Sequence, residues 1–123
     1  MQQVLDHLVE HVPSVIGALV SSTDGFALAS RFAAESHVEP AGMGAMAAAA
    51  IALSNRLVAT VGSSSATVVH HRSNDGHVLI LPVAHLAVLT IMATPRADAE
   101  QLTMVGREAA IGLQRLFRGA VSV

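Results

Sequence analysis

The sequence predicts an α+β protein built around one antiparallel sheet, with helices and strands in the order α-β-β-α-β-β-β-α. Two Asp-Gly turns, at Asp24-Gly25 and Asp75-Gly76, each lie between apolar runs, and this pattern is a strong short-range signal for a β-hairpin. A long alanine-rich segment separates the two hairpins and predicts a helix. An antiparallel hairpin so near the N-terminus argues against a parallel, nucleotide-binding sheet.

Composition limits the class of protein. The chain has 123 residues, so residues 1–123 are expected to form a single domain. It is 52% hydrophobic and only 13% charged, which is more apolar surface than a small domain usually hides, and part of it is expected to meet a partner. Three Phe, no Trp, no Tyr and scattered single arginines argue against nucleic-acid binding. The absence of cysteine excludes disulfides and thiolate chemistry.

The sequence indicates a cytoplasmic protein. The N-terminus lacks the basic start of a signal peptide. No apolar run is expected to reach the ~18 residues of a membrane span, and the alanine-rich segment Ala41–Leu53 falls short. Contact with a membrane is therefore expected only peripherally, through partners.

The first half of the chain reads as helix, hairpin and linker. Apolar residues at helical spacing predict a helix over Gln2–His11, which Pro13 ends. The runs Val15–Val20 and Phe26–Ala29 predict the two strands of the first hairpin. The polar segment Arg31–Glu39 is interpreted as a linker.

The second half begins at Pro40, which suits the first turn of a helix. The longest helix is predicted over Ala41–Val61 and ends at Gly62. Strands are predicted at Ala66–Arg72, His77–Leu81 and Leu86–Ala93, with a turn at Ser73–Gly76 and a connection at Pro82–His85. A final helix starts near Asp98 and Glu100, with an apolar stripe of Leu102, Val105, Ala109, Leu113 and Leu116.

The long middle helix has two predicted faces. Bulky residues, which are expected to pack on the sheet, are Met43, Met46, Ile51, Leu53, Leu57, Val58 and Val61. The smoother opposite side is formed by Ala41, Ala45, Ala48, Ala52 and Ala59, with Asn55 and Arg56. Two interpretations of the smooth side stay open. It is an ordinary exposed alanine face, or it is the seam of a homodimer in which Asn55 fixes the register.

The histidines do not form a convincing metal site. His7, Glu10 and His11 match the H-x-x-E-H motif of zinc peptidases, but on a short terminal helix both histidines are expected to be solvated. His70 and His71 are neighbours on a strand and therefore point to opposite faces. The remaining histidines, interpreted as loop or strand-edge residues, are His37, His77 and His85.

No constellation for catalysis or cofactor binding is apparent either. The chain contains no lysine, which excludes a Walker-type phosphate loop. Asp24 and Asp75 are explained by their turns. We therefore predict no catalytic, cofactor-binding or metal-binding residues.

The first hairpin also resembles a known family. The segments Val12–Ser21 (VPSVIGALVS) and Asp24–Ser30 (DGFALAS) resemble the opening of the roadblock/dynein light chain family. The long small-residue helix and the run Val78–Val83 agree, and the likeness covers about Val4 to Phe117. The resemblance implies a five-stranded antiparallel sheet sandwiched by helices, with a profilin-like architecture. The stand-alone bacterial members are the most similar.

The resemblance further implies partners. It implies a homodimer built from the long helix and the following strand, roughly Ala66–His71. It also implies a non-enzymatic regulator or scaffold of a small Ras-like GTPase, with a sensor kinase complex as a further partner. A small-ligand sensor domain stays open as the alternative function. The predicted dimer-interface residues are Ala41, Ala45, Ala48, Ala52, Asn55, Ala59, Val68 and His70, and the predicted partner contacts are Arg31 and Arg56.

Overall fold

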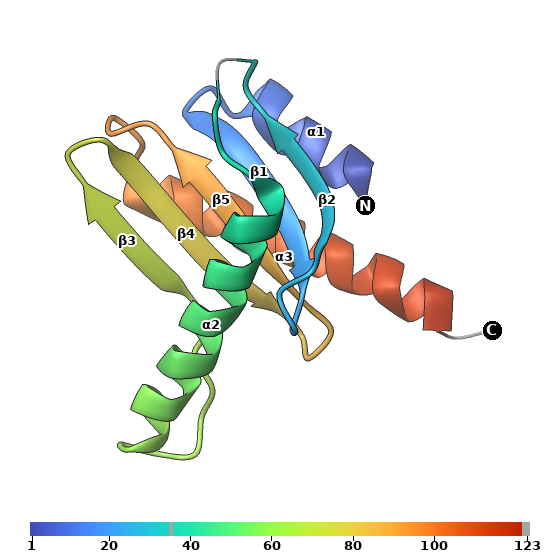
Figure 1. Cartoon of the computed structure of the whole chain (residues 1–123), viewed down its shortest axis with the longest axis vertical. Coiled ribbons are helices and arrows are strands. Elements are labelled where there is room, and N and C mark those ends of the chain that lie inside the picture. The colour runs from blue at the N-terminus through green and yellow to red at the C-terminus, as the bar shows by residue number, and fades with distance from the viewer. Residues whose placement is uncertain (35, 122–123) are drawn as a thin grey trace.

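The computed structural model describes residues 1–34 and 36–121, without the side chains of residues 120 and 121. Its elements confirm the predicted order (Figure 1). They are α1 (Gln2–His11), β1 (Val15–Ser22), β2 (Ala27–Phe32), α2 (Pro40–Ala59), β3 (Val69–Ser73), β4 (Gly76–Val83), β5 (Ala87–Ala93) and α3 (Ala99–Val121).

The five strands form one antiparallel sheet in the order β2-β1-β5-β4-β3. The two hairpins therefore meet in the middle of the sheet, where β1 pairs with β5, and β2 and β3 form its edges. The tight turn of the first hairpin requires glycine. Gly25 has a φ of +95°, and a Cβ placed there would lie 3.0 Å from the Cα of Ala45 in α2.

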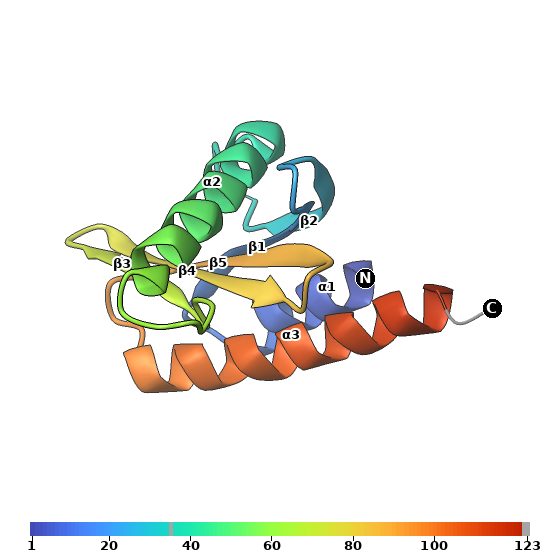
Figure 2. The ribbon, with the colours of Figure 1, turned by 90° about the horizontal axis from the view of Figure 1, so that it is seen from below.

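Helices cover both faces of the sheet unequally (Figure 2). The main core lies between the sheet and the pair α1 and α3, where Leu5, Leu89, Leu102 and Leu113 are almost inaccessible to solvent. Burying each such leucine stabilises the fold by about 1.5–3 kcal/mol. On the other face α2 stands alone, over a much smaller core of Ala47, Ile51, Ile80 and Val88. The face of α2 that points away from the sheet has no covering layer in the described chain.

Several predicted boundaries are wrong by a few residues. β2 continues to Phe32, so Arg31 lies in a strand and not in a linker. β3 begins at Val69 and β5 at Ala87, each later than predicted.

β4 also extends further than predicted, through Pro82. Pro82 pairs with Val88 of β5, while the pairing of β4 with β3 ends opposite Ile80. Because β4 is an edge at that point, the missing N–H of proline breaks no ladder on its outer side.

Candidate functional site

α2 approaches the sheet through its smallest residues. Gly44, Ala47, Ala48 and Ile51 are its buried positions. A Cβ at Gly44 would come within 2.9 Å of the carbonyl oxygen of Gly25 and 3.3 Å of the Cβ of Ser21. The close crossing of α2 over the first hairpin therefore depends on a residue without a side chain.

The predicted division of α2 into two faces is consequently wrong. Met46, Leu53 and Leu57 were expected to pack on the sheet, but they are 64%, 58% and 62% exposed. Val61, also assigned to the bulky side, is exposed beyond the end of the helix, and only Ile51 of that set is buried. The physical reason is that large side chains of the strands, such as Ile80 and Val88, fill the space beneath the helix. The residues of α2 that face the sheet are therefore mostly glycine and alanine.

The predicted seam residues are distributed around α2. Ala48 is buried against the sheet, which contradicts its placement on the smooth outer side. Asn55 accepts a hydrogen bond at its Oδ1 from the backbone N–H of Ala66, at 2.8 Å, and so ties the segment before β3 to the helix. Arg56 is exposed, as are Ala41, Ala45, Ala52 and Ala59.

The outward side of α2 forms a continuous apolar surface, which we call the α2 face: Met46, Ala49, Leu53 and Leu57. Apolar patches of this kind on small domains mark interaction sites.

In the described chain α2 is also the one helix long and apolar enough to cross a membrane, judged by length and composition alone, with a mean hydropathy of 1.3. The expectation that no apolar segment reaches the ~18 residues of a membrane span is therefore wrong for this helix. Core helices of soluble proteins pass the same test.

The edge strand β3 extends the α2 face. A groove of about 440 Å³ lies between the second half of α2 and the chain from Ser65 to His70, with Leu57 and Val58 on its helical side. Within the described residues β3 pairs only with β4, so its outer backbone edge is available for another strand. The predicted interface residues Val68 and His70 lie here, half-buried and exposed respectively.

His77 is a buried residue, 2% exposed, and its interpretation as a loop or strand-edge histidine is wrong. Its Nε2 lies 3.4 Å from the carbonyl oxygen of Pro95, which requires a proton on Nε2. Its Nδ1 then accepts a 2.8 Å hydrogen bond from Nε2–H of His70. Burial lowers the pKa of His70, as do the neighbouring His77, Arg72 and His71. The hydrogen bond between the two rings joins β3 to β4.

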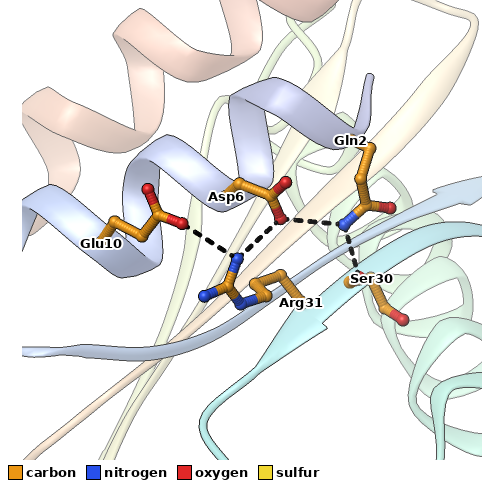
Figure 3. A network of polar contacts seen from close by, with 5 residues as sticks. All are labelled: Gln2, Asp6, Glu10, Ser30 and Arg31. Carbon is orange, nitrogen blue, oxygen red and sulfur yellow. Dashed lines mark hydrogen bonds and ion pairs between the residues drawn. The ribbon is translucent and has the colours of Figure 1, made fainter.

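Arg31, which is predicted to contact a partner, joins β2 to α1 (Figure 3). Its Nη1 donates to Asp6 Oδ1 at 3.0 Å and to Glu10 Oε1 at 3.3 Å. The amide of Gln2 donates to the same Asp6 oxygen at 3.1 Å and to the carbonyl oxygen of Ser30 at 2.9 Å. The guanidinium of Arg31 is therefore held by ion pairs to α1.

The same network makes α1 sensitive to acid. The hydrogen bond from Gln2 lowers the pKa of Asp6, and Arg31 lowers it further. A carboxylate whose pKa falls on folding contributes stability above its usual pKa and loses it as the pH drops through the lowered value. The Asp6 contribution is therefore complete at neutral pH and is lost only in strong acid.

The structure groups no three potential metal-ligating side chains among the described residues. His7 and His11 lie side by side on the exposed side of α1, with their ring centroids 4.3 Å apart and their ring planes tilted by 43°. The candidate site is therefore the exposed apolar surface formed by α2 and β3.

A five-stranded antiparallel sheet with one helix on one face and two on the other places the chain in the profilin-like class of α+β folds. Profilin IA of Acanthamoeba castellanii matches it with a TM-score of 0.67 at 17% identity, over 94% of this chain and 97% of that one.

The chain belongs to the Roadblock/LC7 domain family, whose sequence profile matches residues 1–93. MglB of Myxococcus xanthus shares the fold with a TM-score of 0.86 at 14% identity, over 96% of this chain and 94% of that one. A structure described as MglB with a tetrameric arrangement gives 0.82 at 20% identity, over 92% and 84%. No curated protein matches in sequence.

Proposed function

We propose that this chain is a homodimeric regulator or scaffold of a small Ras-like GTPase, acts in the cytoplasm, and performs no catalysis of its own. The α2 face carries the proposal. A Roadblock/LC7 domain that exposes Met46, Leu53 and Leu57 on a lone helix has a surface suited to a second copy of itself.

In the proposed dimer, the α2 faces of two chains pack together about a two-fold axis. Such a contact is isologous, which means that both chains use the same surface. Each exposed side chain of the α2 face is therefore buried once in each chain, and so two times per dimer. Each fully buried leucine or methionine favours association by about 1.5–3 kcal/mol before the cost of association is subtracted. The free edges of the two β3 strands lie beside this contact and are suited to pair, which would join the two sheets.

Family membership supports the assignment of the partner. The roadblock resemblance implies a Ras-like GTPase, and MglB proteins are among the structures that share the fold. Of the two arginines predicted to contact that partner, Arg31 is engaged with α1, whereas Arg56 is exposed beside the α2 face. We therefore retain Arg56 as the proposed contact. A sensor kinase complex remains a further proposed partner.

The assignment predicts binding that depends on the nucleotide. Ras-like GTPases encoded in the same genome are loaded with GTPγS or GDP and passed over the immobilised chain in biolayer interferometry. We expect one nucleotide state to bind about 5- to 150-fold more tightly than the other, which is the usual range of coupling. Arg56→Glu should weaken this binding, and Arg96→Glu, an exposed arginine elsewhere, should not. Equal binding of both states, or no binding to any of these GTPases, would contradict the proposal.

A second candidate, the small-ligand sensor, is favoured by one observation. A groove of about 380 Å³ lies between α1 and α3, with the apolar side chains Val4, Leu8, Val105 and Ala109 on its walls. The test is to measure the melting temperature of the protein with each member of a metabolite library. A saturable rise with one compound, together with no nucleotide-dependent binding of a GTPase, would favour the sensor function.

A further inference from the structure

The edge strand β3 is held on the sheet by little apolar burial (Figure 1). Among the described residues it pairs only with β4, and Val69 is its one half-buried residue, because the four that follow are exposed. Segments with few buried apolar contacts open locally more often than the core of a sheet. A side-chain contact that joins β3 to the interior is therefore important for keeping the strand in place.

The hydrogen bond between His70 and His77 is such a contact. His77 is paired with Arg72, two residues after His70, so the two histidines are diagonal neighbours on one face of the sheet. Their ring centroids are 5.1 Å apart, and 2.8 Å separate Nε2 of His70 from Nδ1 of His77. Because His77 is only 2% exposed, the pair links the exposed edge strand to the buried side of β4.

Added protons work against this contact. In the neutral pair Nε2–H of His77 donates to the carbonyl oxygen of Pro95, and its Nδ1 accepts from His70. One added proton still allows the rings to share a hydrogen bond, but it places a positive charge on a pair of which one ring is buried. A second added proton puts hydrogen on both facing nitrogens, so the bond between the rings is lost.

The surroundings of the pair do not compensate such a charge. In the described residues the ion pairs within 4.0 Å all involve Arg31 of β2, so no carboxylate approaches either ring. β4 and β5 carry no ionisable side chain besides His77. The ionisable groups on the other elements around the pair are His71 and Arg72 on β3, Asp75 in the turn before β4, Arg56 on α2, Arg96 and Asp98 before α3, and Glu100, Arg107 and Glu108 on α3.

The direction of the pH dependence follows from His70. Burial lowers the pKa of His70, and the neighbouring His77, Arg72 and His71 lower it further. The folded chain therefore takes up this proton less readily than the unfolded chain. Its contribution to stability is complete above the usual pKa of histidine and falls as the pH drops below that value.

We propose that the His70–His77 pair is an acid-sensitive clasp, which holds the edge strand β3 on β4 near neutral pH and releases it in mild acid. In the open strand both rings reach water and take up protons freely. A histidine in water has a pKa of about 6.5, so at about pH 5.5 its protonated form exceeds the neutral form about tenfold. Opening of β3 should therefore become about tenfold more frequent for each proton that the open strand takes up and the closed pair excludes.

Amide hydrogen exchange tests the clasp in the intact protein. Exchange of β3 is measured by mass spectrometry at about pH 7.5 and about pH 5.5, with labelling times scaled to the intrinsic rate and with β5 as the internal reference. In the parent, exchange of β3 relative to β5 should rise about tenfold in acid. His77→Gln should lose most of this rise, because its amide can donate to Pro95 and accept from His70 without taking up a proton. His85→Gln, at an exposed histidine in the turn between β4 and β5, should keep the rise.

Two results would overturn the proposal. The first is exchange of β3 that keeps pace with β5 at both pH values in the parent. The second is a rise in His77→Gln as large as that in the parent. Ring nitrogen NMR of the parent adds a test that needs no variant, because near neutral pH His77 should carry its proton on Nε2, and a proton on Nδ1 would contradict the clasp.

A consequence for assembly rests on the proposed α2 dimer, which places the two β3 edges beside the contact. Opening of β3 should weaken that dimer in acid, as measured by sedimentation velocity at the same two pH values. If the parent is monomeric at both, the α2 dimer fails and the exchange of β3 still decides the clasp. If the dimer is equally strong at both while exchange rises, the clasp stands and the β3 edges do not pair. The rise should persist in Leu53→Glu, which disrupts the α2 face, and a rise confined to the dimer would contradict the clasp.

Discussion

Replacing Leu53 by glutamate is expected to convert the protein from a dimer to a folded monomer. The side chain is 58% exposed on the α2 face and belongs to neither core cluster, so the fold should tolerate the change. In the proposed seam, two glutamates would face each other about the two-fold axis, in an apolar contact without partners. Light scattering at low micromolar concentration should show twice 12.7 kDa for the parent and 12.7 kDa for the variant.

The control for this variant is Leu86→Glu. Leu86 is also an exposed leucine, but it lies in the turn between β4 and β5, away from the α2 face. It should leave the dimer intact, and both variants should retain the circular dichroism of the parent. A Leu53→Glu protein that keeps the parent's mass would show that the α2 face does not hold the dimer together.

Replacing Ala48 by glutamate, only five residues away on the same helix, is expected to destabilise or unfold the protein. Ala48 is 9% exposed and faces the sheet, where a carboxylate would have no partner. An unpaired buried charge of this kind costs about 3–5 kcal/mol, against a total stability of about 5–15 kcal/mol for a typical domain. Urea unfolding monitored by circular dichroism measures the difference.

The matched control is Ala52→Glu, an exposed alanine one turn further along α2. Both substitutions are made in the Leu53→Glu background, so that association does not contribute to the measured stability. Ala52→Glu should change the free energy of unfolding by no more than about 0.5 kcal/mol. Equal effects of the two substitutions would contradict the burial of Ala48 against the sheet.

The order of elements was predictable because its signals are local. Gly25 and Gly76 occupy tight turns with positive φ, and the residues on either side carry the strands. The orientation of α2 was not predictable from periodicity, because the helix is apolar on every side and no polar face shows which side is outward. The small residues Gly44, Ala47 and Ala48 are the usable signal, because a helix that packs closely on a sheet needs small side chains at the contact.

The roles of Arg31 and His77 could not be read from the sequence for a different reason. Arg31 contacts Asp6, 25 positions earlier, and His77 contacts the carbonyl of Pro95, 18 positions later. Neither spacing belongs to a helix or a turn, so the contacts exist only once the sheet has brought the segments together. Single residues in such places look like solvated charges or edge histidines until the topology is known.

Cross-linking through a single introduced cysteine tests the central claim, the α2 dimer, most directly. The chain contains no cysteine, so Leu53→Cys provides the only thiol. Mild oxidation or a short bismaleimide should convert this variant to a covalent dimer on a non-reducing gel, while Leu86→Cys, exposed elsewhere, should remain monomeric. Cross-linking of Leu53→Cys that is no faster than that of Leu86→Cys would contradict the proposed dimer and, with it, the function assigned to this surface.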